Sequence, residues 1–133
     1  MSGETNIKSL LKSMTPKLND GEYVFCSLSS ISSLNPEDII GTFKEEEGWT
    51  VVLDKAVADK LNYEYSYIAS WITLTIHSSL EAVGLTAAFS NALAEASISC
   101  NVVAAYYHDH IFVDRKDAEK AMEVLKRLSE DNR

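Results

Sequence analysis

The second half of the sequence has an order of segments that few folds accommodate. Residues 71–76 (WITLTI) and 98–107 (ISCNVVAAYY) are rich in strand-forming side chains, and 111–113 (IFV) is a shorter run of the same kind. Apolar residues at spacings of three and four predict a helix over 80–96 and a second one after Asp114. Strand, helix, strand, strand, helix is the order of the ferredoxin-like βαββαβ unit without its final strand.

Polar residues predict where these segments begin and end. Ser78 and Glu81 have the spacing of a capping box, in which the two side chains satisfy amide donors at the start of the helix. Asp114 is suited to cap the last helix, and the polar residues 129–133 are expected to fray. Asp109 is expected at the bend of the hairpin, because aspartate tolerates the positive φ that a short reversal often needs.

The first half reads as a shortened copy of this order. YVFCSL (23–28), IIGTF (39–43) and WTVVL (49–53) have strand character, and Asp54 can cap a short helix over 55–61. FCSLSS lies 49 residues before LTIHSS, whereas VLD lies 60 residues before FVD, and the 11-residue difference is about three helical turns. This half therefore corresponds to a unit that has lost its first helix, although short strand–Asp–helix junctions also recur by chance.

The repeat predicts two α+β units in tandem, a degenerate one at 1–66 with an N-terminal extension and a fuller one at 67–133. Each is expected to be an antiparallel sheet with helices on one face. The missing last strand of the second unit leaves an open sheet edge, which natural proteins normally cover. We expect that either an N-terminal strand or a second copy of the chain, in a homodimer, completes that sheet.

Charge and composition disfavour several classes of partner. Twelve basic and twenty acidic residues give a net charge of −8, so nucleic acid and anionic membrane surfaces would be repelled. No apolar run reaches the roughly 20 residues of a membrane span, and the N-terminus lacks the pattern of a secretory signal, which favours a cytoplasmic location. Cys26 and Cys100 each lie in an apolar run and are expected to be reduced, structural thiols.

Three stretches resemble the ACT-domain family, in particular small stand-alone proteins built of tandem ACT-like units. They are HSSLEAVGLTAAFSNALAEASISCNVVAAYYHDHIFV (77–113), EYVFCSL (22–28) and FKEEEGWTVVL (43–53). The resemblance implies ferredoxin-like modules that bind amino acids or other small effectors and associate side by side through their sheets. It implies a regulatory binding protein with no catalytic domain attached. We expect a homo-oligomer that is not an enzyme and that uses no cofactor or metal.

The loop ahead of the predicted helix is the candidate ligand site. Amides at a helix N-terminus suit the carboxylate of an amino acid, serine hydroxyls add donors, and Glu81 could pair with an ammonium group. Gly84 would allow close backbone approach, and the Asn101 amide could orient a ligand. The capping box alone also explains the serines and Glu81. The predicted ligand-binding residues are His77, Ser78, Ser79, Leu80, Glu81, Val83, Gly84 and Asn101.

The three histidines offer an alternative from another class, a small metal-dependent enzyme. His108 and His110 would face the same way in a strand, and the strand order places His77 at the same end of the sheet as the hairpin tip. These histidines with Asp109 could then form a metal site, although a turn explains His-Asp-His equally well. A second alternative is a protein-interaction module that binds no small ligand.

Overall fold

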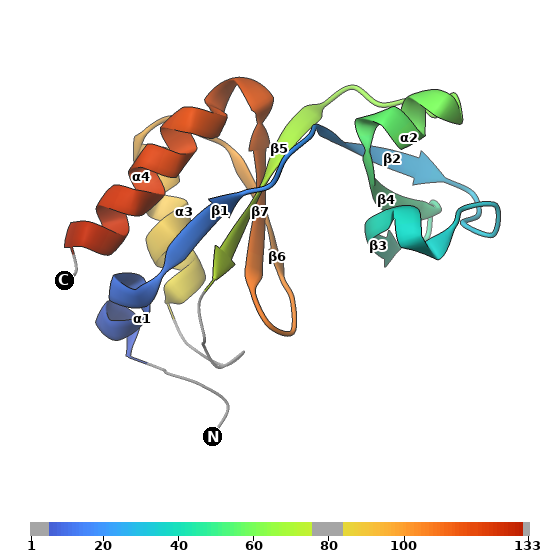
Figure 1. Cartoon of the computed structure of the whole chain (residues 1–133). Coiled ribbons are helices and arrows are strands. Elements are labelled where there is room, and N and C mark those ends of the chain that lie inside the picture. Colours follow the sequence, from blue (N-terminus) through green and yellow to red (C-terminus); the bar gives the residue numbers. More distant parts are fainter. Residues whose placement is uncertain (1–5, 76–83, 132–133) are drawn as a thin grey trace. The chain divides into compact units, whose positions relative to one another are not determined.

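The structure is a computed structural model, and it describes residues 6–75 and 84–131 (Figure 1). The chain divides into two compact units. The described residues up to Asn19 and from Trp71 onward form one unit, called here the C-terminal unit; Asp20–Ser70 form the other, the inserted unit. The N-terminal extension therefore groups with the second half of the chain, whereas the sequence-based division placed it in the unit 1–66.

The C-terminal unit has a four-stranded antiparallel sheet with helices on one face (Figure 1). Its strand order is β1-β5-β7-β6. The strands are β1 (Thr15–Leu18), β5 (Ile68–Thr75, of which the part from Trp71 onward belongs to this unit), β6 (Cys100–Ala104) and β7 (Asp109–Asp114). With β5 taken as the first strand, this is the order of a ferredoxin-like sheet, and the expected fold class is confirmed.

The sheet edge that the sequence left open is covered by β1. This strand pairs antiparallel with β5 from Thr15↔Thr75 to Leu18↔Ile72. It takes the place of the last strand of the βαββαβ unit, although it comes first in the chain. The expectation that an N-terminal strand completes the second sheet is thus confirmed.

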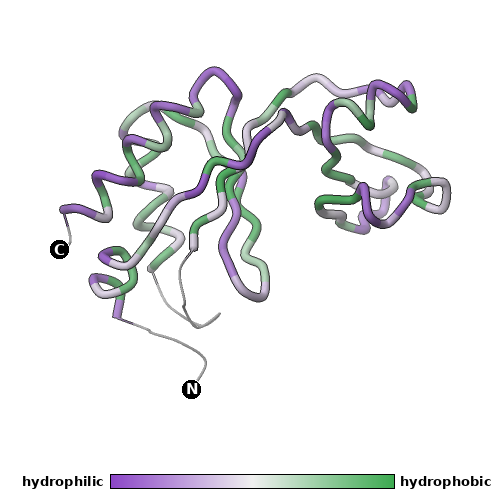
Figure 2. The backbone as a smooth tube through the Cα atoms, viewed as in Figure 1, coloured by the Kyte–Doolittle hydropathy of each residue, from purple (hydrophilic) through white to green (hydrophobic). Residues whose placement is uncertain are grey.

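Three helices cover one face of this sheet: α1 (Ile7–Ser13), α3 (Leu85–Glu95) and α4 (Ala118–Asp131). Ile72 and Leu74 of β5 and Ile111 and Val113 of β7 are fully buried beneath them. Along α4, hydrophobic and hydrophilic positions alternate as an amphipathic helix requires (Figure 2). The helix side chains of this core include Leu10, Leu11, Leu85, Phe89, Leu93, Ala121 and Leu125.

Two helix boundaries differ from the sequence-based expectation. The first described turn of α3 begins at Leu85, after an N-cap at Gly84, rather than at residue 80. The prediction that the polar residues from 129 onward fray is wrong up to Asp131, because α4 continues to that residue. Ser129 is buried there, and its hydroxyl donates to the Lys12 carbonyl at 3.1 Å. The contact with α1, which the sequence did not predict, holds this last turn in place.

The inserted unit repeats the same strand order without the first helix of the βαββαβ order. Its sheet runs β3-β4-β2-β5, and pairs β2 with the start of β5 at Tyr23↔Ala69 and Val24↔Ile68. Where the first helix would be, the chain has only the short 3₁₀ turn η1, as the 11-residue shortening of this half predicted. The elements are β2 (Tyr23–Leu28), η1 (Pro36–Asp38), β3 (Ile39–Lys44), β4 (Trp49–Asp54) and α2 (Lys55–Lys60).

Both predicted aspartate caps are present. The Asp54 carboxylate accepts the Ala56 amide at 2.8 Å at the start of α2. The Asp114 carboxylate accepts the Lys116 amide at 3.0 Å in η2 (Arg115–Asp117), the 3₁₀ turn that leads into α4. The same strand–Asp–turn junction thus occurs in both units, which supports the internal repeat.

The β6–β7 hairpin turns at a different place from the one predicted. Asp109 is already paired with Ala104 as the first residue of β7. The Ala105 amide donates to the His108 carbonyl at 3.1 Å, so Tyr106 and Tyr107 form the tip. No residue of this turn has a positive φ, so Asp109 is not needed there for its conformational tolerance.

Candidate functional site

The predicted ligand loop meets the described structure at Gly84. This residue has the left-handed φ of +86°, and its carbonyl accepts the Ala88 amide at 2.9 Å. Within the described residues no side chain caps this end of α3. The amides of Leu85, Thr86 and Ala87 precede the first helical hydrogen bond, and they lie where the helix dipole favours an anion.

The apolar side chain of Ile7 borders this helix end. A Cβ atom placed on Gly84 would lie 3.9 Å from Cγ1 of Ile7, the first residue of α1. Ile7 also packs against the core of the C-terminal unit. The predicted loop residues His77, Ser78, Ser79, Leu80, Glu81 and Val83 lie outside the described residues, so their ligand roles stay predictions.

Asn101 lies on the other face of the sheet from α3. Cys100 and Val102 of β6 pack against the helix-covered core, so the alternation of the strand directs Asn101 away from it. Its partner across the ladder is Phe112, which is also absent from that core cluster. The structure therefore does not bring Asn101 together with Gly84 within one unit.

The sheet face that carries Asn101 also holds a polar cluster that the sequence did not predict. The indole Nε1–H of Trp71 donates to Nδ1 of His110 at 3.0 Å. The Thr73 hydroxyl lies 3.2 Å from the same nitrogen, and Nδ2 of Asn19 donates to that hydroxyl at 2.9 Å. Trp71 also stacks on Phe112 with ring centroids 6.1 Å apart. Strand alternation could have placed Trp71, Thr73 and His110 on one face, but not side by side.

These contacts fix the protonation state of His110. An indole N–H can only donate, so Nδ1 accepts and carries no proton, and the Thr73 hydroxyl must donate to it as well. Burial lowers the pKa of His110, and the neighbouring His108 lowers that pKa further. His108 lies with its ring centroid 6.4 Å from that of His110, and its buried Nδ1 has no hydrogen-bond partner among the residues that the structure describes. This arrangement favours a neutral His110.

The structure describes only some of the residues of the alternative metal site. In the ranges 6–75 and 84–131, no group of three or more histidine, cysteine or acidic side chains is arranged to hold a metal ion. His77, which that alternative requires, lies outside these ranges. Nδ1 of His110 is already engaged by Trp71. Both cysteines are free, and burial raises the pKa of Cys26, as expected for a structural thiol.

The inserted unit contains a groove beside β2 with a volume of about 840 Å³. Phe25 and Ser27 form its strand side, and the segment between α2 and β5 forms the rest. That segment contributes Asn62, Tyr63, Glu64, Tyr65 and Ser66, and α2 adds Asp59. Tyr63 and Tyr65 also pack against the core of the inserted unit. No sequence pattern predicted the groove.

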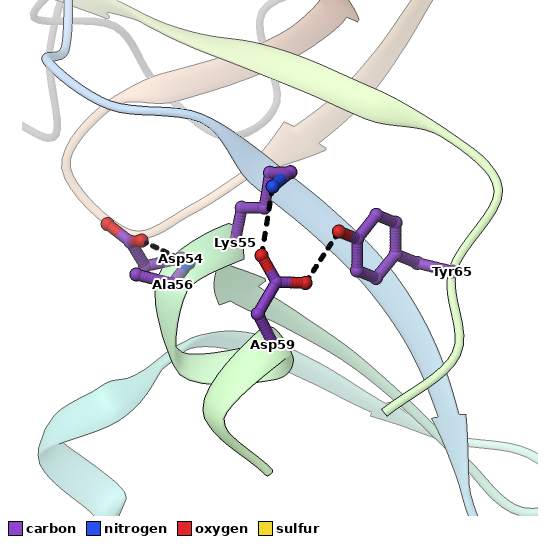
Figure 3. A network of polar contacts seen from close by, with 5 residues as sticks. All are labelled: Asp54, Lys55, Ala56, Asp59 and Tyr65. Carbon is purple, nitrogen blue, oxygen red and sulfur yellow. Dashed lines mark hydrogen bonds and ion pairs between the residues drawn. The ribbon is translucent and has the colours of Figure 1, made fainter. Parts of the chain in front are cut away.

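A polar clamp holds one wall of this groove (Figure 3). Both oxygens of Asp59 are engaged: Lys55 Nζ lies 2.9 Å from Oδ2, and the Tyr65 hydroxyl donates to Oδ1 at 2.6 Å. The Tyr65 hydroxyl lowers the pKa of Asp59, and Lys55 lowers it further. The Asp59 carboxylate raises the pKa of both Lys55 and Tyr65. The clamp ties the segment after α2 to the helix itself.

Among the helices that the structure describes, none combines the length and the apolar character needed to cross a membrane.

Comparison with protein families gives two adjacent matches. Models of the ACT domain match residues 2–70 and 66–127. A comparison with curated protein sequences gives no match. The two matched ranges together cover nearly the whole chain and confirm the resemblance seen in the sequence.

Solved structures with the same fold include proteins of known and unknown function. A Vibrio cholerae protein of unknown function, described as a possible transport protein, is 48% identical, with a TM-score of 0.83 over 92% of this chain and 94% of its own. Protein Atu0741 from Agrobacterium tumefaciens is 17% identical, with a TM-score of 0.63 over 87% and 89%. The ligand-free regulatory subunit of aspartate kinase from Thermus thermophilus is 8% identical, with a TM-score of 0.55 over 86% and 95%.

Proposed function

Because this chain belongs to the ACT-domain family, we propose that it is a non-catalytic regulatory protein that binds an amino acid at the N-terminus of α3. ACT domains bind small effectors, and the fold is shared with the regulatory subunit of an aspartate kinase. The proposal includes a cytoplasmic location and assembly into a homo-oligomer. No part of this proposal requires a cofactor.

The observation that carries the proposal is the start of α3, where no side chain of the described residues caps the helix. Gly84 adopts φ +86° and contributes no side chain, so the first-turn amides of Leu85, Thr86 and Ala87 are left for an external acceptor or for the loop before them. A carboxylate placed there gains about 0.3–1 kcal/mol from the helix dipole, in addition to its hydrogen bonds. Glu81, three residues before Gly84, is the proposed partner of the ligand's ammonium group.

A thermal-shift screen with the twenty proteinogenic amino acids tests this. A true ligand at 100 times its Kd should stabilise the protein by about 2.7 kcal/mol. Glu81→Gln should weaken that ligand about tenfold, whereas Glu119→Gln, which changes an exposed carboxylate on α4, should leave the affinity unchanged. The absence of any stabilising amino acid, or equal effects of both variants, would contradict the proposed site.

A further inference from the structure

We propose that the groove of the inserted unit is a second binding site, which takes an extended, cationic peptide segment of a partner protein as an added strand beside β2. This site is separate from the amino-acid site at α3. It is lined entirely by residues of the inserted unit, so it does not depend on the proposed function above.

The first step is the end of β2 at Ser27, on the edge of this strand that faces away from β4. The Lys55 amide donates to the Glu22 carbonyl at 2.8 Å, which makes Glu22 and Lys55 a hydrogen-bonded pair continuing the β2–β4 ladder. By the alternation of an antiparallel ladder, the backbone groups of Tyr23, Phe25 and Ser27 point to the opposite edge. On that edge β5 pairs only with Tyr23 and Val24.

Ser27 is therefore the position where a new strand could bond. Its outward N–H and C=O have no backbone partner among the residues that the structure describes. The groove lies at this place, since Phe25 and Ser27 form its strand side. An unpaired edge beside a groove is the arrangement that peptides use when they add a strand to a sheet.

The second step is the chemistry of the groove walls. The rings of Phe25, Tyr63 and Tyr65 supply apolar surface and aromatic faces that attract cations. Two carboxylates, Asp59 and Glu64, line the groove, and none of the lining residues is cationic. Lys55 already neutralises Asp59 through the clamp (Figure 3), which leaves exposed Glu64 without an ion pair in the described structure.

The third step concerns the identity of the occupant. A second copy of this chain carries a net charge of −8 and would bring like charge to a groove that already holds two carboxylates. A free amine would satisfy Glu64 but not the backbone groups of Ser27. An extended segment with lysine at alternate positions satisfies both, because its amides can pair with Ser27 while its ammonium groups reach the carboxylates.

The test uses the full chain and an acetylated, amidated heptapeptide of alternating lysine and valine, with ¹⁵N-resolved amide spectra. We expect saturable shifts at Ser27 and at residues 64–66, and slower hydrogen exchange of the Ser27 amide. The same peptide with N-methylated amides, and a glutamate–valine peptide, should each bind at least about fivefold more weakly. Spermine should leave the exchange of Ser27 unchanged.

Two variants complete the test. Glu64→Lys should weaken the lysine–valine peptide about fivefold and reverse the preference toward the glutamate–valine peptide. Glu119→Lys, on the exposed face of α4, should change neither affinity. The proposal is overturned if the lysine–valine peptide leaves Ser27 and residues 64–66 unshifted, if spermine protects Ser27 equally, or if self-association of the protein alone produces the same protection.

Discussion

One hydrogen-bonded cluster determines the donor and acceptor roles of several side chains on the face of the C-terminal sheet opposite the helices. His110 accepts from Trp71 and lies against Thr73, which in turn accepts from Asn19. Each of these groups has a donor or acceptor role that the others require, so protonation of His110 at Nδ1 would turn an acceptor into a donor facing a donor. The cluster should therefore be sensitive to pH.

The direction of this sensitivity follows from the lowered pKa of His110. Below about pH 6.5, the ordinary histidine pKa, the unfolded chain binds a proton at this position that the folded protein resists. Stability should therefore be full above about pH 6.5 and fall as the pH drops toward the folded-state pKa. Urea midpoints measured between pH 7.5 and 5.5 check this.

His110→Asn is the matched variant, because its amide oxygen can still accept from Trp71 but does not titrate. Its urea midpoint should fall less over the same pH range than that of the parent protein. Asp109 acts with the opposite sign: burial raises its pKa, so its protonated form favours the folded state at low pH. Equal pH slopes for the variant and the parent protein would show that His110 is not the group responsible.

Two glycines of the inserted unit provide a second prediction at this scale. Gly48 has φ +147°, and a Cβ atom there would lie 2.7 Å from the Leu28 carbonyl oxygen. Gly41 in β3 has no atom within 4 Å of the same position and no unusual φ. We expect Gly48→Ala to cost about 1–3 kcal/mol of unfolding free energy and Gly41→Ala to be neutral or stabilising, as measured by urea unfolding. Similar costs for both would contradict this account.

At the scale of single residues, the sequence predicted caps better than contacts. Asp54 and Asp114 cap because the pattern is local, whereas the Trp71–His110 bond joins residues 39 positions apart. Asp109 was expected at the hairpin tip, but the ladder from Cys100↔Val113 to Ala104↔Asp109 carries the turn to Tyr106 and Tyr107. Pairing register is set by side-chain burial across the sheet, which a single strand does not reveal.

At the scale of elements, the N-terminal segment formed by α1 and β1 supplies both core side chains and a strand to the C-terminal unit. Helix α1 and its C-cap Met14 place Leu10, Leu11 and Met14 in the core of the C-terminal unit, and β1 then completes the sheet beside β5. The Lys12 carbonyl of this segment also accepts a hydrogen bond from the hydroxyl of Ser129, near the end of α4. The C-terminal unit therefore depends on residues from both ends of the described chain.

Leu10 and Leu18 form a matched pair that tests this dependence. Leu10 is 1% exposed and Leu18 is 39% exposed, although both lie in the N-terminal segment. Leu10→Ala should cost about 2–5 kcal/mol, and Leu18→Ala clearly less, in urea unfolding. Hydrogen exchange should accelerate in α4 and β5 of the Leu10→Ala protein. A Leu10→Ala cost no larger than that of Leu18→Ala would mean that the segment does not belong to this core.

The sequence predicted most strands and helices because their periodicity is local and strong. The hairpin at 39–53 and the amphipathic α4 are examples. It did not predict α1, because that helix is only seven residues long and is stabilised by packing against α3 and α4 rather than by its own pattern. The need for β1, in contrast, followed from the missing strand of the second unit.

For the whole molecule, the two ACT matches and the repeated strand order describe one module used twice, once with and once without its first helix. The module that keeps this helix provides the N-terminus of α3, which is proposed to bind an amino acid. The inserted unit instead has a groove at the edge of β2. In the proposed account, the first site senses a small effector and the second contacts a partner.

The most direct measurement of the central claim is an amide-resolved titration with the amino acid that stabilises the protein and with its carboxamide. The free amino acid should shift the amides of Leu85, Thr86 and Ala87 in a saturable way, because its carboxylate accepts from the start of α3. The carboxamide, which lacks that charge, should bind at least about tenfold more weakly. Unshifted amides at 85–87, or equal affinity for both compounds, would contradict the account.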